Sequence, residues 1–230
     1  MDNLTHTLTA LALSRAGLDR LTPHAAWILV VAANAPDIDV AAGLAGSIEY
    51  LRYHRGYTHA LAVAPLLAVA PVALVRAVAR RPIPWLRATL VSLAGILSHL
   101  LLDWTNTYGI RLLLPFSGDW LRLDLLNVID VWTWAALALA VIGPAMSRLV
   151  GSEIGEARGT TGRGAARAAL AFLFLWTGAR AVLHERAAAV LDARLYQGAP
   201  PRRVFAFPTP LDPLRWTGVV EGDGFAAVYN

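Results

Sequence analysis

The chain has 230 residues and a formal net charge of +4; 57% of the residues are hydrophobic and only 16% are charged. A soluble domain usually carries about a quarter charged residues, so this composition favours a protein of the lipid bilayer. The absence of cysteine excludes disulfides and thiolate metal sites. Because the arginines are spread between apolar segments and form no single basic stripe, we expect no nucleic acid among the partners.

The apolar segments predict an all-α fold, a polytopic membrane bundle of about six helices, four long and two short. In chain order they lie at residues 4–18, 24–40, 58–78, 85–104, 128–150 and 165–183. The first two are marginal as membrane spans, whereas each later segment approaches the roughly 20 apolar residues that cross a bilayer.

After the last apolar segment the sequence changes character. Prolines, aromatic residues and β-branched residues dominate from residue 197, which predicts a short β-rich tail. We therefore divide the chain into a membrane-embedded helical domain at residues 1–190 and an extracytoplasmic tail at residues 197–230. Few residues remain after the last strand-like run, so we expect a truncated tail domain. The Gly- and Arg-rich stretch at residues 151–164 is typical of a flexible loop.

The arginine distribution predicts how the bundle is oriented. The connections on one side hold ten arginines, and those on the other side hold four. The positive-inside rule places the ten-arginine side in the cytoplasm. We therefore expect a multi-pass protein of the cell inner (plasma) membrane with both termini outside.

Histidine and aspartate residues recur at the outer ends of the predicted helices. Ionisable residues are costly at the edge of an apolar helix and indicate a functional site there. His99 and Asp103 are four residues apart, so they share one helix face. The candidate metal ligands are His6, Asp37, His54, His59, His99, Asp103 and Asp130.

The residue types indicate the chemistry of this site. Imidazole and carboxylate without thiolate suit zinc, manganese, iron or nickel, and we expect a divalent metal, zinc first and manganese as the alternative. A bound cation activates water for hydrolysis. Asp37 or Asp39 could orient or deprotonate that water. Arg55 could hold an anionic oxygen, because a guanidinium matches the geometry of phosphate.

The chain resembles the inner-membrane metal-dependent hydrolases of the YdjM-like, LexA-regulated family. The resemblance covers roughly residues 1–150 and rests on DNLTHTLTALALSRAGL, NAPDIDV, YHRGYTHALAVAPLLA, SHLLLDWTNTYGIRLLLPFS and LDLLNVIDVW. The segment PTPLDPLRW resembles the C-terminal part of longer members. The resemblance implies a metal-dependent hydrolase and a distant similarity to the zinc phospholipase C and single-strand nuclease group. His99 and Asp103 match the His-x3-Asp pair of that group, and His6, Asp37, His54 and His59 correspond to its other ligands.

Three functions remain open from the sequence. The leading hypothesis is a membrane-bound hydrolase that cleaves a phosphoester, either a lipid or a small molecule at the outer membrane face. Membrane lipid and this substrate are its expected partners. The alternatives are a metal or ion transporter, and a structural membrane protein in which the His/Asp cluster only buttresses helices.

Overall fold

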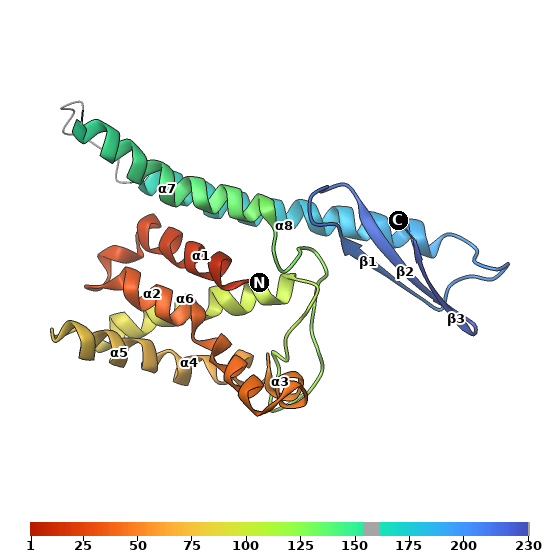
Figure 1. The fold of residues 1–230 in the computed structure, drawn as a ribbon, viewed down its shortest axis with the longest axis horizontal. Helices are drawn as coiled ribbons and strands as arrows, with labels where there is room; N and C mark the ends of the chain where they lie inside the picture. The colour runs from red at the N-terminus through yellow and green to blue at the C-terminus, as the bar shows by residue number, and fades with distance from the viewer. Residues whose placement is uncertain (154–161, 230) are drawn as a thin grey trace.

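The computed structural model describes residues 1–153 and 162–229 (Figure 1). Over these residues the chain is mostly helical and ends in a three-stranded sheet. The loop predicted at residues 151–164 falls largely outside the described residues.

Three helices form the part of the core that positions the site. They are α1 (Asn3–Ala16), α2 (Ala25–Asn34) and α6 (Trp85–Thr105). Asp2 caps α1, because its side chain accepts hydrogen bonds from the backbone N–H groups of Leu4 and Thr5. Helix α2 packs directly on α6 at Gly95, where a Cβ atom would lie 3.0 Å from Ala32 Cβ. The missing side chain at Gly95 therefore lets the two backbones approach closely.

Short helical segments connect this core. Helix α2 bends by 43° into the 3-10 helix η2 (Pro36–Ala45), and the short helix α3 (Ser47–Tyr53) follows. Pro36 starts η2, since a proline needs no N–H partner in the first turn. The sequence predicted neither η2 as a separate element nor α3.

The predicted span at residues 58–78 is broken into several helical segments. Its residues fall in η3 (Tyr57–His59), α4 (Ala64–Leu67) and α5 (Val69–Ala79), and the chain turns by 87° between Ser47–His59 and Ala64–Ala79. At the break the Leu61 N–H donates to the carbonyl of Leu112, a connection that a continuous helix could not make. Tertiary pairing therefore overrides the apolar pattern here.

Three described helices are long and apolar enough to cross a membrane. They are α6, α7 (Val131–Glu153) and α8 (Arg163–Asp192), and the number rises to five if each bent pair counts as one span. Helices α7 and α8 lie side by side along α1 and extend past the core (Figure 1). Helix α8 has 30 residues and is longer than the predicted segment at residues 165–183.

The C-terminal sheet confirms the predicted β-rich character of the tail. Strands β1 (Arg203–Pro208), β2 (Trp216–Gly222) and β3 (Phe225–Tyr229) pair antiparallel in the order β1-β2-β3. The sheet packs on the end of α8, where Gly218 leaves room for Leu191. The domain boundary at residue 190 stays a prediction, because α8 runs through that position without a break.

Candidate metal centre

Four ionisable side chains from three elements meet where α6 ends. Asp37 comes from η2, His59 from η3, and His99 and Asp103 from α6. One ligand atom of each lies within 4.8 Å of the others, so the group could hold a metal ion. His59, His99 and Asp103 are fully buried, and Asp37 is 7% exposed. We call these four residues the four-ligand group.

The spacing within the four-ligand group fits a tetrahedral ion. The Nε2 atoms of His59 and His99 lie 3.1 Å apart. Asp103 Oδ2 lies 3.6 Å from His59 Nε2 and 3.5 Å from His99 Nε2, and Asp37 Oδ1 lies 3.5 Å and 3.7 Å from the same two nitrogens. Zinc bonds of about 2.0–2.1 Å place tetrahedral ligand atoms about 3.3–3.4 Å apart. Five of the six distances in the group are therefore close to those a zinc ion would set.

Hydrogen bonds behind the two imidazoles fix the direction of their lone pairs. The Nδ1–H of His99 donates to the carbonyl of Ala33 over 2.7 Å. His59 Nδ1 lies 3.3 Å from Asp39 Oδ2 and 3.1 Å from Thr58 Oγ1. A carbonyl or carboxylate oxygen can only accept, so the proton of each neutral ring resides on Nδ1. Each Nε2 then presents a lone pair to the centre, as a metal ligand requires.

Asp39 lies behind His59, and its oxygens already have partners. It accepts hydrogen bonds from the backbone N–H of Arg55 over 2.8 Å and from Thr58 Oγ1 over 2.7 Å. His54 Nδ1 lies 2.8 Å from its other oxygen. Asp39 thus contacts the Nδ1 side of His59, and the water-activating role predicted for it stays a prediction.

Arg55 lies at the edge of the four-ligand group and is buried. Its Nη2 atom lies 3.2 Å from Asp103 Oδ2, and its Nη1 donates to Asn106 Oδ1 and to the carbonyl of Gly109. The guanidinium carbon lies 4.5 Å from the ring centroid of Tyr108. Its Nε has no hydrogen-bond partner among the described residues.

His6 adjoins the four-ligand group without belonging to it. Its ring stacks on that of His99 with centroids 3.8 Å apart, and its Nε2 lies 3.3 Å from Asp103 Oδ1. Neither ring nitrogen has a hydrogen-bond partner among the described residues, although the side chain is fully buried. The amino group of Met1 also contacts Asp103 Oδ1.

Besides His6, two more of the predicted ligands lie outside the four-ligand group. His54 is separated from it by Asp39, and its ring stacks on Tyr50 with centroids 4.6 Å apart. Asp130 caps α7, because its Oδ1 accepts a hydrogen bond from the Thr133 N–H over 2.8 Å. A long segment without a helix, residues 106–130, separates α6 from α7 and places Asp130 away from the four-ligand group.

Sequence reasoning missed Asn106, which joins several groups of the site. Its Nδ2 donates to Asp103 Oδ1, and its Oδ1 accepts from Arg55 and from the backbone N–H groups of Tyr108 and Gly109. The stretch TNTYG directly after the His99–Asp103 pair carried a signal for it. An Asn at a helix end followed by Gly is typical of a turn that its side chain stabilises.

Comparison with known protein families assigns the chain to a family. Residues 1–187 match the model of the YdjM inner membrane protein family. The chain belongs to this family. It is therefore an inner membrane protein, and its four-ligand group is a candidate metal site.

The chain is also 30% identical over 149 residues to a protein of Bacillus subtilis (strain 168) described as "Uncharacterized protein YfhP". The match covers 61% of the chain and 45% of that relative, so the chain spans less than half of the relative's length. No solved structure matches the chain.

Proposed function

We propose that the chain is a membrane-bound, metal-dependent hydrolase that cleaves a phosphoester with metal-activated water. The observation that carries this proposal is the close approach of two imidazole nitrogens and two carboxylate oxygens in the buried four-ligand group. The resemblance to YdjM-like hydrolases, and through them to the zinc phospholipase C and single-strand nuclease group, supports the same activity.

The donor set fits zinc, with manganese as the alternative, because it combines imidazole with carboxylate. Asp103 Oδ2 is buried and lies 3.2 Å from the Arg55 guanidinium, and it also faces the Nε2 atoms of His59 and His99 at 3.6 and 3.5 Å. An ion at this point would have two imidazole nitrogens and two carboxylate oxygens as ligands. Asp37, His59, His99 and Asp103 would hold the ion. The metal would supply a bound water of lowered pKa and a Lewis acid for the phosphoryl oxygen.

The chain's own residues would provide the remaining interactions. Arg55 holds an anionic phosphoryl oxygen, because its guanidinium borders the four-ligand group and its Nε is free to donate. Asp37 is the least buried ligand and the carboxylate that can also accept a proton from the attacking water. Asp39 and the carbonyl of Ala33 hold the two imidazoles in position.

The substrate in this proposal is a phosphoester at the outer membrane face, either a lipid or a small molecule. The four-ligand group lies at the C-terminal end of α6, the end that the arginine distribution assigns to the outside.

Elemental analysis of the purified chain, coupled to a screen of phosphodiester substrates, tests the proposal. We expect stoichiometric zinc or manganese and a phosphodiesterase activity that both His99→Ala and Asp103→Ala abolish. His24→Ala is the matched control, because His24 lies at the start of α2, outside the four-ligand group. A purified protein without stoichiometric metal contradicts the proposal. Metal-dependent ion uptake into liposomes, without hydrolysis, would favour the transporter.

A further inference from the structure

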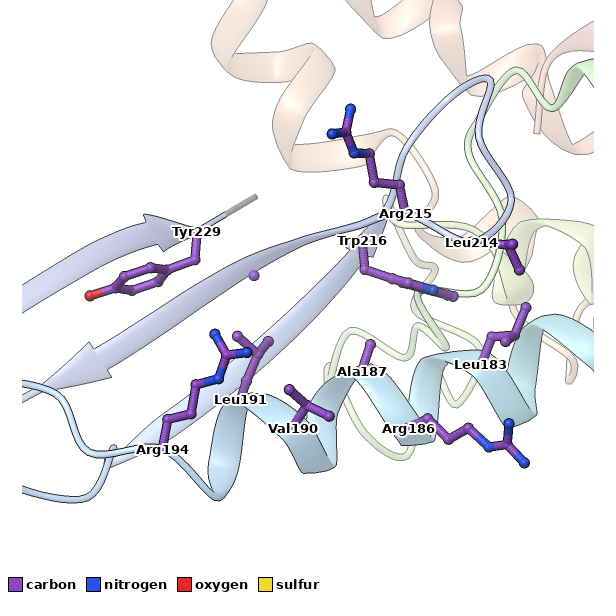
Figure 2. A pocket seen from close by; sticks show the side chains of 11 residues that line it. Leu183, Arg186, Ala187, Val190, Leu191, Arg194, Leu214, Arg215, Trp216 and Tyr229 are labelled. Carbon is purple, nitrogen blue, oxygen red and sulfur yellow. The ribbon is translucent and has the colours of Figure 1, made fainter.

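A pocket lies between the end of α8 and the C-terminal sheet, far from the four-ligand group (Figure 2). It has a volume of about 360 Å³. Leu183 and Leu191 of α8 form one wall, and Trp216 of β2 forms part of the other. The pocket therefore has an apolar interior large enough for part of a small organic ligand.

Arginines surround this interior. Arg186 and Arg194 come from the helix side and Arg215 from the residue before β2, and all three side chains are exposed. Figure 2 shows the guanidinium of Arg194 directed toward the strands, whereas the side chains of Arg186 and Arg215 lie at the rim and point away from the space. No acidic residue lines the pocket, and none of the three arginines forms an ion pair within the described part of the chain. The pocket consequently presents unpaired positive charge beside an apolar surface, which matches an anionic amphiphile.

From the length of α8 we expect this pocket at the membrane surface. Its 30 residues rise about 45 Å at 1.5 Å per residue, whereas the hydrocarbon core is about 30 Å thick. The apolar part of the helix ends at Leu183, and Glu185 and Arg186 follow. The pocket starts at this boundary and continues for the last turns of the helix. Trp216 and Tyr229 also line it, and Trp and Tyr are enriched at the level of lipid headgroups.

We propose that this pocket binds the phosphate headgroup of an anionic phospholipid. Arg194 and Arg215 contact the phosphate from the two walls, because guanidinium groups on long side chains can turn toward a shared anion. An acyl chain runs past Leu183 and Leu214 along the apolar side of α8. The lipid thus joins the C-terminal sheet to the bilayer at a site that is independent of the proposed hydrolase centre.

The test compares two variants of the full chain that lose the same charge from the same part of the molecule. Arg194→Gln/Arg215→Gln removes two arginines from the pocket. Arg202→Gln/Arg203→Gln removes two arginines that do not line it, one of which pairs with Asp223 on the surface. Each protein is purified in a neutral detergent and mixed with phosphatidylglycerol or phosphatidylcholine, and the retained lipid is measured by native mass spectrometry. The melting temperature without lipid shows that both variants fold.

We expect the wild type and the Arg202/Arg203 variant to retain phosphatidylglycerol in preference to phosphatidylcholine. The Arg194/Arg215 variant should lose that preference by tenfold or more. Inorganic phosphate, added alone, should not raise the melting temperature of any of the three proteins. Equal losses in both variants would mean general charge attraction and would overturn the proposal. A preference for neither lipid, or stabilisation by phosphate alone, would overturn it as well.

Discussion

The Nε2 atoms of His59 and His99 lie 3.1 Å apart, although forty residues separate them in the chain. Their Nδ1 atoms face Asp39 and the carbonyl of Ala33, so both neutral rings present a lone pair to the same point. A proton on either Nε2 would turn this contact into a hydrogen bond, whereas a metal cation would accept both lone pairs. The hydrogen bonds at Nδ1 orient the two rings for the second arrangement, and these bonds can be tested separately from the ligands.

Removal of the metal should destabilise the wild-type protein. We expect EDTA to lower the melting temperature of the wild type but not that of His99→Ala, which has already lost a ligand. An ion present at a thousandfold excess over its Kd stabilises the folded state by about 4 kcal/mol. The His24→Ala control should respond like the wild type. If EDTA lowers the melting temperature of His99→Ala by the same amount, the ion binds elsewhere.

Asp39→Asn should weaken metal retention while the four ligands stay intact. Loss of a carboxylate behind a ligating histidine lowers metal affinity by about 10–100-fold. The variant should regain phosphodiesterase activity when the metal concentration is raised, because Asp39 positions His59 without touching the ion. Asp119→Asn is the control, since Asp119 is exposed and bonded only locally to Ser117. Failure of excess metal to restore activity would point to a direct catalytic role.

Arg55→Lys should raise the KM for a phosphoester and leave the metal content unchanged. Lysine keeps the charge but cannot reproduce the fork of the guanidinium, so we expect a loss of about tenfold or more in kcat/KM. Arg52→Lys serves as the control, because the Arg52 side chain is exposed and stacks on Tyr53. An unchanged KM in Arg55→Lys would exclude contact between Arg55 and the substrate.

Gly95→Ala should separate α2 from α6 and so disturb the centre. The added Cβ would lie 3.0 Å from Ala32 Cβ and 3.2 Å from the carbonyl of Leu29, and such overpacking costs about 1–3 kcal/mol. We expect a lower melting temperature and weaker metal retention, because Asp37 follows α2 and His99 lies on α6. Gly143→Ala in α7 adds a Cβ that meets nothing within 4 Å and should leave both properties unchanged. Equal effects of the two changes would argue against the close approach at Gly95.

Asp124→Asn should stabilise the protein at neutral pH. Burial raises the pKa of the Asp124 carboxyl above its ordinary value, and the nearby Arg122 only partly offsets this effect. The folded state therefore holds its proton more tightly than the unfolded chain does, and stability falls as pH rises from about 4 through the raised pKa. Asparagine has no proton to lose in this pH range, so the variant keeps the stability that the wild type loses as pH rises. Asparagine also tolerates the positive φ of 54° at this position. Melting temperatures at pH 4 and pH 7 should show a difference between variant and wild type that grows with pH; a constant difference would contradict the prediction.

The sequence alone determined the properties that depend on short-range pattern. Apolar segments of bilayer length predicted the spans that became α6, α7 and α8, and the change in composition predicted the small sheet at the end of the chain. The spacing of four between His99 and Asp103 put both on one face, because helical periodicity is local.

Only the tertiary structure decided which other residues join that pair. Asp37 reaches it because α2 packs on α6 at Gly95 and then bends into η2. His59 reaches it because the apolar run at residues 58–78 breaks after η3, when Leu61 bonds to Leu112. His54 and Asp130 looked equivalent to these ligands in the sequence, but backbone turns give them other hydrogen-bond partners. Such turns depend on contacts between distant segments, so a pattern of neighbouring residues does not encode them.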